Sequence, residues 1–198
     1  MTPTWRDSRT RTIDAPRRFN KLPAVMKPLR PLRLLVLLFV LCGTVGCDQT
    51  TKHFARTKLN PFDSVMLLGG FGELRLAENP GAFLSLGDTM PPAMRMLVFT
   101  GGAGTGLLTM LIYLLFRPGL PWLSFAGISA VLAGGLGNLI DRILRHGLVT
   151  DFITLHCGPF HTGVFNIADV LVMIGMALLV GAAWQSRQPE PPANVPLE

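Results

Sequence analysis

The chain has 198 residues, of which 49% are apolar and 15% charged, and its mean hydropathy is +0.42. Soluble domains carry roughly 25% charged residues, and one core of this size cannot hide long stretches without charge, so the composition excludes an ordinary soluble domain. It indicates a membrane protein. The net charge of +6 is also compatible with a nucleic-acid-binding arm, but the arginines are not interleaved with aromatic residues, and we expect no nucleic-acid partner.

The first 31 residues form a basic segment. Nine of the 18 lysines and arginines precede Leu34, namely Arg6, Arg9, Arg11, Arg17, Arg18, Lys21, Lys27, Arg30 and Arg33. Positive charge of this kind stays on the cytoplasmic side of a membrane. We expect residues 1–31 to be a disordered cytoplasmic tail, 32–184 to form the folded domain, and 185–198 to be a second cytoplasmic tail.

Four apolar segments approach the roughly 20 residues that a membrane span needs. They are Leu32–Cys47, Met94–Phe116, Trp122–Ile140 and Phe165–Trp184. Asp48-Gln-Thr-Thr-Lys52 can continue the first, with Asp48 and Lys52 paired four residues apart. The sequence predicts an all-α membrane protein with four transmembrane helices, at about 32–55, 94–116, 122–140 and 165–184.

An even number of spans places both termini in the cytoplasm, together with the turn Arg117–Pro121. The loops 48–93 and 141–164 then lie outside. The N-terminus can also be interpreted as a lipoprotein signal peptide with Cys47 as the lipidated residue, which would make the chain a non-catalytic membrane lipoprotein. Three further spans favour a retained first helix instead.

Carboxylate and amide side chains gather at the outer ends of the last two spans. Asn138, Asp141 and Arg142 share a helix face, and Asp141 with Arg142 predicts an ion pair or a hydrogen-bonded latch. Asn166 and Asp169 share a face of the fourth helix. Ionisable groups at a membrane boundary are costly and therefore indicate a functional site.

Asp151, in the loop that leads back toward the fourth helix, can lie beside Asp169. Two adjacent carboxylates do not both ionise readily, so one keeps a proton while the other acts as a base, as aspartic peptide hydrolysis requires. The greater depth of Asp169 favours it as the protonated member. Pairing of Asp151 with Arg142 or Arg145 is the structural alternative, and a small proton-coupled carrier is the functional one.

Other chemistries lack their usual marks. The sequence contains no G-x-S-x-G, S-x-x-K or H-E-x-x-H motif. His146, His156, His161 and Cys157 have spacings that fit no closed zinc pattern, so we expect neither a metal nor a cofactor. Gly102 and Gly106 predict close helix packing.

The outer loop has two local signals. Phe71–Glu78 alternates partly as a strand does. Asn79-Pro-Gly81 follows, in which proline extends Asn79 and Gly81 permits a turn or a close approach of the backbone to a ligand.

Taken in order, five motifs resemble those of lipoprotein signal peptidase, the signal peptidase II family, over Leu32 to Trp184. They are Asp48-Gln-Thr-Thr-Lys52, Asn79-x-Gly81-Ala82, Gly137-Asn-Leu-Ile-Asp-Arg142, Val149-x-Asp-Phe-Ile153 and Phe165-Asn-x-Ala-Asp169. The resemblance implies a bacterial inner-membrane aspartic protease, monomeric and surrounded by lipid, that removes signal peptides from prolipoproteins by cutting before a diacylglyceryl-modified cysteine. Globomycin-type cyclic peptides would inhibit it.

The resemblance also implies roles for residues. Asp151 and Asp169 would be the catalytic pair. The substrate-binding or supporting positions would be Asp48, Asn79, Gly81, Asn138, Asp141, Arg142, Asn166 and Ala168, to which the expected ion pair adds Lys52. A small extracytoplasmic β-cradle would lie within about residues 60–90. Phe83, the long basic tail and His156-Cys157 depart from the family pattern.

Overall fold

The computed structural model describes residues 29–81 and 89–187. Its helical elements are α1 (Pro31–Lys58), α2 (Pro92–Met96), the π-helical η3 (Leu97–Gly102), α3 (Ala103–Phe116), α4 (Trp122–Leu144) and α5 (Ile167–Gln185). Because α2, η3 and α3 run on as one rod, four helices of the described chain are long and apolar enough to cross a membrane. This confirms the predicted fold class of four transmembrane helices. The basic residues before Leu29, the family departure at Phe83 and most of the second tail lie outside the described residues.

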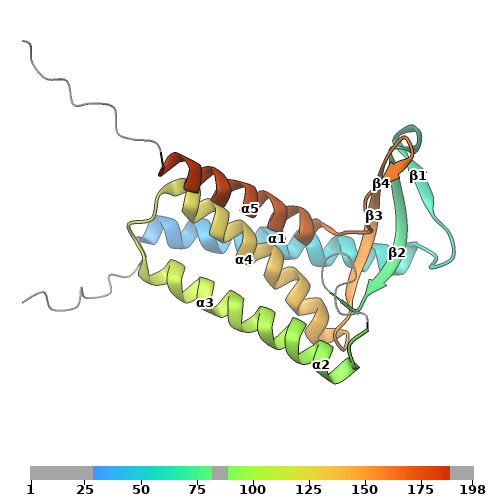
Figure 1. Cartoon of the computed structure of the whole chain (residues 1–198), viewed down its shortest axis with the longest axis horizontal. Coiled ribbons are helices and arrows are strands. Elements are labelled where there is room, and N and C mark those ends of the chain that lie inside the picture. Colours follow the sequence, from blue (N-terminus) through green and yellow to red (C-terminus); the bar gives the residue numbers. More distant parts are fainter. Residues whose placement is uncertain (1–28, 82–88, 188–198) are drawn as a thin grey trace, which may run out of the picture.

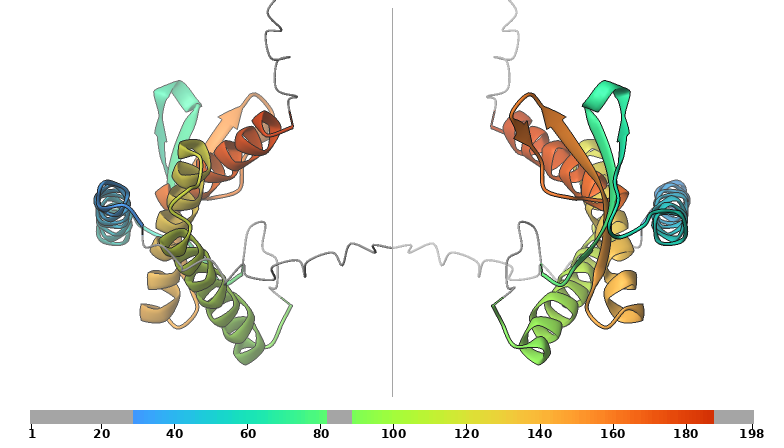
Figure 2. Two further views of the ribbon diagram at one scale, coloured as in Figure 1. Left: turned by 90° about the vertical axis from the view of Figure 1, so that its left-hand side faces the viewer. Right: turned by 90° about the vertical axis from the view of Figure 1, so that its right-hand side faces the viewer.

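Helix α4 is the central helix of the bundle. It packs against α1, α3 and α5, and Figure 2 shows it between them when the bundle is viewed from either end. Leu37 of α1, Leu114 of α3, and Phe125, Ile128 and Leu132 of α4 form the buried apolar core. Half of the apolar window of α4 is buried, a larger share than in the other three spans, which fits a helix that has protein on most sides.

Glycines bring α4 and α5 into close contact. A Cβ atom on Gly134 would lie 2.3 Å from the carbonyl oxygen of Ala168, and one on Gly175 would lie 2.7 Å from that of Gly127. Only hydrogen fits at such separations, so these glycines let the two backbones touch. The predicted packing role of Gly102 and Gly106 is wrong, because a Cβ on either would meet no atom within 4 Å.

A four-stranded antiparallel sheet caps one end of the bundle. Its strands, in spatial order, are β1 (Val65–Leu67), β2 (Gly72–Asn79), β3 (Val149–Cys157) and β4 (Phe160–His161), and a short 3-10 turn, η1 (Leu68–Gly70), joins the first two. The strand expected before Asn79 is therefore present as β2. The segment around Asp151, predicted to be a loop, is instead strand β3, which pairs with β2 so that Ala77 faces Asp151 and Asn79 faces Val149.

The sheet lies at the opposite end of the bundle from the start of α1 and the end of α5. In Figure 1 the strands run across the bundle axis at one end, whereas the start of α1, the end of α5 and the turn between α3 and α4 lie at the other. The last turns of α1 and α4 and the first turn of α5 therefore meet the base of the sheet. All the polar motifs of the sequence converge there.

Candidate active site

Asp169 is fixed by the start of α5. Asn166 is the N-cap of this helix, and its Oδ1 accepts a hydrogen bond from the backbone N–H of Asp169 at 3.0 Å. In return, the backbone N–H of Asn166 donates to Asp169 Oδ2 at 3.1 Å. This reciprocal capping box satisfies two backbone donors that the first turn would otherwise leave free, and it locks the carboxylate at the end of the bundle.

Asn166 also joins Asp169 to Asp151. Its Nδ2 donates to Asp151 Oδ1 at 2.6 Å, while Asn79 of β2 donates to Asp151 Oδ2 at 3.0 Å. Asn138 of α4 donates to Asp169 Oδ1 at 2.8 Å. Each of the four carboxylate oxygens thus accepts one N–H from an asparagine. The structure brings the two predicted aspartates together through two helices, α4 and α5, and two strands, β2 and β3.

Asp151 is the more deeply buried of the two aspartates. Asp151 is only 2% exposed, and this burial raises its pKa to about 6. The nearby charge of Asp169 acts in the same direction. Hydrogen bonds from Asn79 and Asn166 oppose this rise. The expectation that Asp169 is the deeper member is wrong, since Asp169 is partly exposed. Pairing of Asp151 with an arginine is also not found among the described residues.

A buried ammonium group supports the aspartates from α1. Lys52 Nζ lies 2.8 Å from Asp48 Oδ2, which confirms the predicted pair, and 3.3 Å from Asp141 Oδ2. It donates its third hydrogen bond to Asn138 Oδ1 at 2.9 Å. Because Lys52 can only donate, it holds the oxygen of the Asn138 amide toward itself and so directs the NH₂ group to Asp169.

Asp48 connects α1 to the other two helices of the site. Its Oδ1 accepts from the backbone N–H of Ala168 at 3.0 Å. A Cβ on Gly137 would lie 2.6 Å from Asp48 Oδ2, so the glycine of this motif makes room for the carboxylate. Ala168 acts through its backbone, and its fully buried methyl group lies against the same glycine.

Asp141 and Arg142 have different partners. Asp141 Oδ2 accepts from the backbone N–H of Thr150 at 2.9 Å, so the predicted ion pair with Arg142 is wrong and the hydrogen-bonded latch is present. Arg142 Nη2 instead donates to the carbonyl oxygen of Gly81 at 3.1 Å. The N–H of Gly81 in turn donates to Asn79 Oδ1 at 3.0 Å, which orients the Asn79 amide toward Asp151.

The sequence motifs did not single out three further residues of this network. Gln49 donates to the carboxylates of Asp48 and Asp141, Arg56 donates to the hydroxyl of Thr150, and Thr150 is fully buried. Arg56 could have been found from spacing, because it follows Lys52 by one helical turn on the same face. Nothing in the sequence indicates that Thr150 is buried.

The histidines belong to the outer part of the sheet. His156 Nε2 lies 2.8 Å from Glu73 Oε2, and this hydrogen bond lowers the pKa of Glu73. The ring of His161 is 5.7 Å from that of His156. Within residues 29–81 and 89–187, no three His, Cys, Asp or Glu side chains are placed to hold a metal ion.

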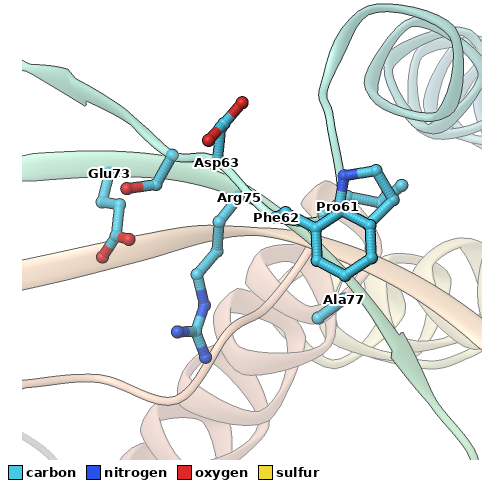
Figure 3. A pocket seen from close by; sticks show the side chains of 8 residues that line it. Pro61, Phe62, Asp63, Glu73, Arg75 and Ala77 are labelled. Atoms are coloured by element: carbon cyan, nitrogen blue, oxygen red, sulfur yellow. The ribbon is translucent and has the colours of Figure 1, made fainter.

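A pocket of about 250 Å³ also lies on this outer part. It is bounded by Phe62 in the loop after α1 and by β2, from which Glu73 and Arg75 project on the same side (Figure 3). None of its lining residues takes part in the hydrogen bonds of Asp151 or Asp169. The aspartates are therefore the better candidates for chemistry.

Comparison with known proteins identifies the family. The family model described as signal peptidase (SPase) II matches residues 39–185. A lipoprotein signal peptidase of Moorella thermoacetica is 36% identical over 167 residues, which cover 80% of this chain and 99% of that protein. One of Syntrophus aciditrophicus is 33% identical over 74% of this chain and 91% of its own length.

Solved structures agree with this result. A bacterial membrane enzyme solved at 2.3 Å matches with a TM-score of 0.68 and 27% identity, covering 86% of this chain and 99% of its own. A second, at 1.9 Å, matches with a TM-score of 0.64 over 80% of this chain and 97% of its own. The match to the family model begins upstream of Cys47, which lies within the continuous helix α1. This chain belongs to the signal peptidase II family.

Proposed function

We propose that Asp151 and Asp169 are the catalytic pair of an aspartic peptidase. As a member of the signal peptidase II family, the chain is a protease that removes signal peptides from prolipoproteins. The observation that carries the aspartic mechanism is the shared contact with Asn166, whose side-chain N–H binds Asp151 and whose backbone N–H binds Asp169. Two carboxylates held against one residue have coupled titrations.

The proposed reaction uses one proton shared between the two carboxyl groups. The ionised member takes a proton from a water molecule as the water oxygen attacks the scissile carbonyl carbon, and the protonated member donates to the carbonyl oxygen. When the tetrahedral intermediate collapses, the C–N bond breaks and a proton passes to the leaving amine. A pKa of about 6 keeps Asp151 close to the pH at which it can both accept and return a proton.

We propose that cleavage occurs immediately before a diacylglyceryl-modified cysteine, on the extracytoplasmic side of the membrane. The substrate is itself an apolar helix that ends in acyl chains, so its scissile bond lies near the membrane surface. The aspartates lie at the sheet end of the bundle, at the end of spans that are about one bilayer long. Both termini would lie in the cytoplasm, with the enzyme monomeric in the lipid.

The remaining site residues would hold the pair in place. Lys52, with Asp48 and Asp141, would orient Asn138, while Arg142 and Gly81 would orient Asn79. Through Ala168, Asp48 would also fix the start of α5. The pair would then need no metal or cofactor, because carboxyl groups supply both the base and the acid.

Cleavage of a diacylglyceryl-modified prolipoprotein in detergent tests the proposal. We expect Asp151→Asn and Asp169→Asn each to lower kcat by about a thousandfold, the range of an acid or base group, while the thermal unfolding of the variants still shows a folded protein. Asp63→Asn is the matched control, because Asp63 is exposed and its side chain bonds to Asn60 outside the site. Full activity of a folded Asp151→Asn or Asp169→Asn protein would remove that residue from the catalytic pair.

A further inference from the structure

Two arginines from different helices hold one pair of residues at the base of the sheet. Thr150 of β3 and Glu78 of β2 are direct partners in the strand register. Arg56 of α1 donates to Thr150 Oγ1 at 3.0 Å, and Arg145, at the end of α4, forms an ion pair with Glu78. The pair is thereby tied to α1 on one strand and to α4 on the other.

This cross-strand pair lies directly beside the groups that carry the chemistry. Asp151 follows Thr150 on β3, and Asn79 follows Glu78 on β2. Because side chains alternate along a strand, the Thr150 and Glu78 side chains lie on the face of the sheet opposite to that of Asp151 and Asn79. The arginines therefore contact the two strands from the opposite face, and their hydrogen bonds and ion pairs in the described chain go to Thr150, Glu78 and Asp141.

We infer that Arg56, Thr150, Glu78 and Arg145 form a two-arginine clamp that positions Asn79 against Asp151. The inference rests on the proposed role of Asp151. These four are positioning residues, since they act on the reaction through the distance between the Asn79 amide and the Asp151 carboxylate, which is 3.0 Å in the structure. The clamp matters because residues 72 apart in sequence must keep that contact.

Folding stability does not account for the Arg145–Glu78 half of the clamp. The Arg145 and Glu78 side chains are 28% and 46% exposed, and an ion pair of that kind contributes little to folding stability. The reaction rate depends more strongly on the position of the two strands than folding stability does. A shift of about 1 Å at a catalytic group can lower the rate by about a hundredfold. A purely structural pair and a positioning pair therefore give different results on mutation.

The pH profile provides the distinguishing measurement. The hydrogen bond from Asn79 lowers the pKa of Asp151, so a looser bond raises that pKa and moves the alkaline limb of the kcat profile, where the pair loses its shared proton, to higher pH. The other charges that act on Asp151 come from Lys52 of α1, Arg142 of α4 and Asp169 of α5. Changes to the clamp leave all three in place.

The experiment compares Glu78→Gln, Arg145→Gln and the double variant for cleavage of the same lipidated substrate. We expect each single variant to keep its thermal unfolding temperature, to lose roughly tenfold in kcat with little change in KM, and to shift the alkaline limb to higher pH. The double variant should lose no more than either single one, because both remove the same contact. Arg145→Lys, which keeps the charge, should recover part of the rate.

Three further variants make the result specific. Glu73→Gln is the matched control, since it changes another side-chain contact between β2 and β3, the hydrogen bond of Glu73 with His156, away from the catalytic pair. Its pH profile should equal that of the wild type. On the other strand, Thr150→Val should behave as the clamp variants do, whereas Thr150→Ser, which keeps the hydroxyl acceptor for Arg56, should remain active.

Failure of the clamp and failure of the proposed function give separate outcomes. A wild type that cleaves and depends on Asp151, with an unshifted profile in folded Glu78→Gln and Arg145→Gln proteins, overturns the clamp alone. Additive losses in the double variant also overturn it. An Asp151→Asn protein that still cleaves overturns the catalytic assignment and the clamp with it.

Discussion

At the scale of single residues, the hydrogen bond from Asn79 has the clearest effect on the ionisation of Asp151. Its amide donates to Asp151 Oδ2, and this bond opposes the effect of burial on the pKa of that carboxyl. In Asn79→Ala the donor is lost, the ionised form of Asp151 is less stable, and the pKa rises above about 6. Because Asp151 then keeps the shared proton to higher pH, we expect the alkaline limb of kcat to move to higher pH, measured by cleavage between pH 5 and 8.

Asn60→Ala is the control for this change. Asn60 bonds to Asp63 in the outer loop, and its loss should leave the pH profile unaltered. If the alkaline limb of Asn79→Ala coincided with that of the wild type, the Asn79 bond would not set the ionisation that limits the rate.

The same scale shows what local spacing can and cannot predict. Asp48 and Lys52 are four residues apart on one helix, so their pairing followed from geometry and is present. Asp141 and Arg142 are adjacent, and adjacent residues on a helix point in different directions. Their partners, Lys52 and Gly81, come from other elements, and no spacing within one helix could have identified them.

At the scale of elements, the contact between α4 and α5 positions the asparagines of the site. Gly134 lies against the backbone of Ala168, two residues beyond the N-cap that holds both aspartates. In Gly134→Ala the new Cβ would lie 2.3 Å from a carbonyl oxygen, so the helices must separate. We expect a loss of about 1 to 3 kcal/mol in stability and a fall in cleavage rate, measured by thermal unfolding in detergent and by the lipoprotein assay.

Gly106→Ala is the matched control, because a Cβ at Gly106 of α3 meets nothing within 4 Å. Alanine should be tolerated there or stabilise the helix slightly, by roughly 0.5 to 1 kcal/mol. An equal effect of the two substitutions would mean that the close approach of α4 and α5 is not what Gly134 provides.

Elements differed in how far the sequence predicted them. Length and apolarity alone indicate the four spans, because a helix in lipid must satisfy its own backbone within one segment. Strand β3 was missed for the opposite reason, since its hydrogen-bond partner β2 is distant in sequence. Val149, Thr150, Asp151 and Phe152 are all buried, so β3 lacks the alternation of apolar and polar residues that reveals a strand with one exposed face.

At the scale of the whole molecule, the two ends of the bundle differ in charge and in role. The start of α1 is held at the end opposite the sheet, where Arg33 donates to the carbonyl oxygen of Pro118 at 3.0 Å and lies over the ring of Trp122. Nine of the 18 lysines and arginines precede Leu34, and Arg117 belongs to the turn between α3 and α4 at this same end of the bundle. By the positive-inside rule we expect this end to face the cytoplasm and Asp151 to face outward.

Thiol labelling in intact cells tests this orientation. Cys157 lies at the end of β3, on the strand that carries Asp151, and is exposed. With Cys42→Ser and Cys47→Ser in the background, a membrane-impermeant maleimide should label Cys157 from outside. When Cys157→Ser is combined with Gly119→Cys, in the open turn between α3 and α4, labelling should occur only after lysis, because that turn should face the cytoplasm. The reverse pattern would place the aspartates on the cytoplasmic side, where a signal peptide that has already crossed the membrane could not present its cleavage point to them.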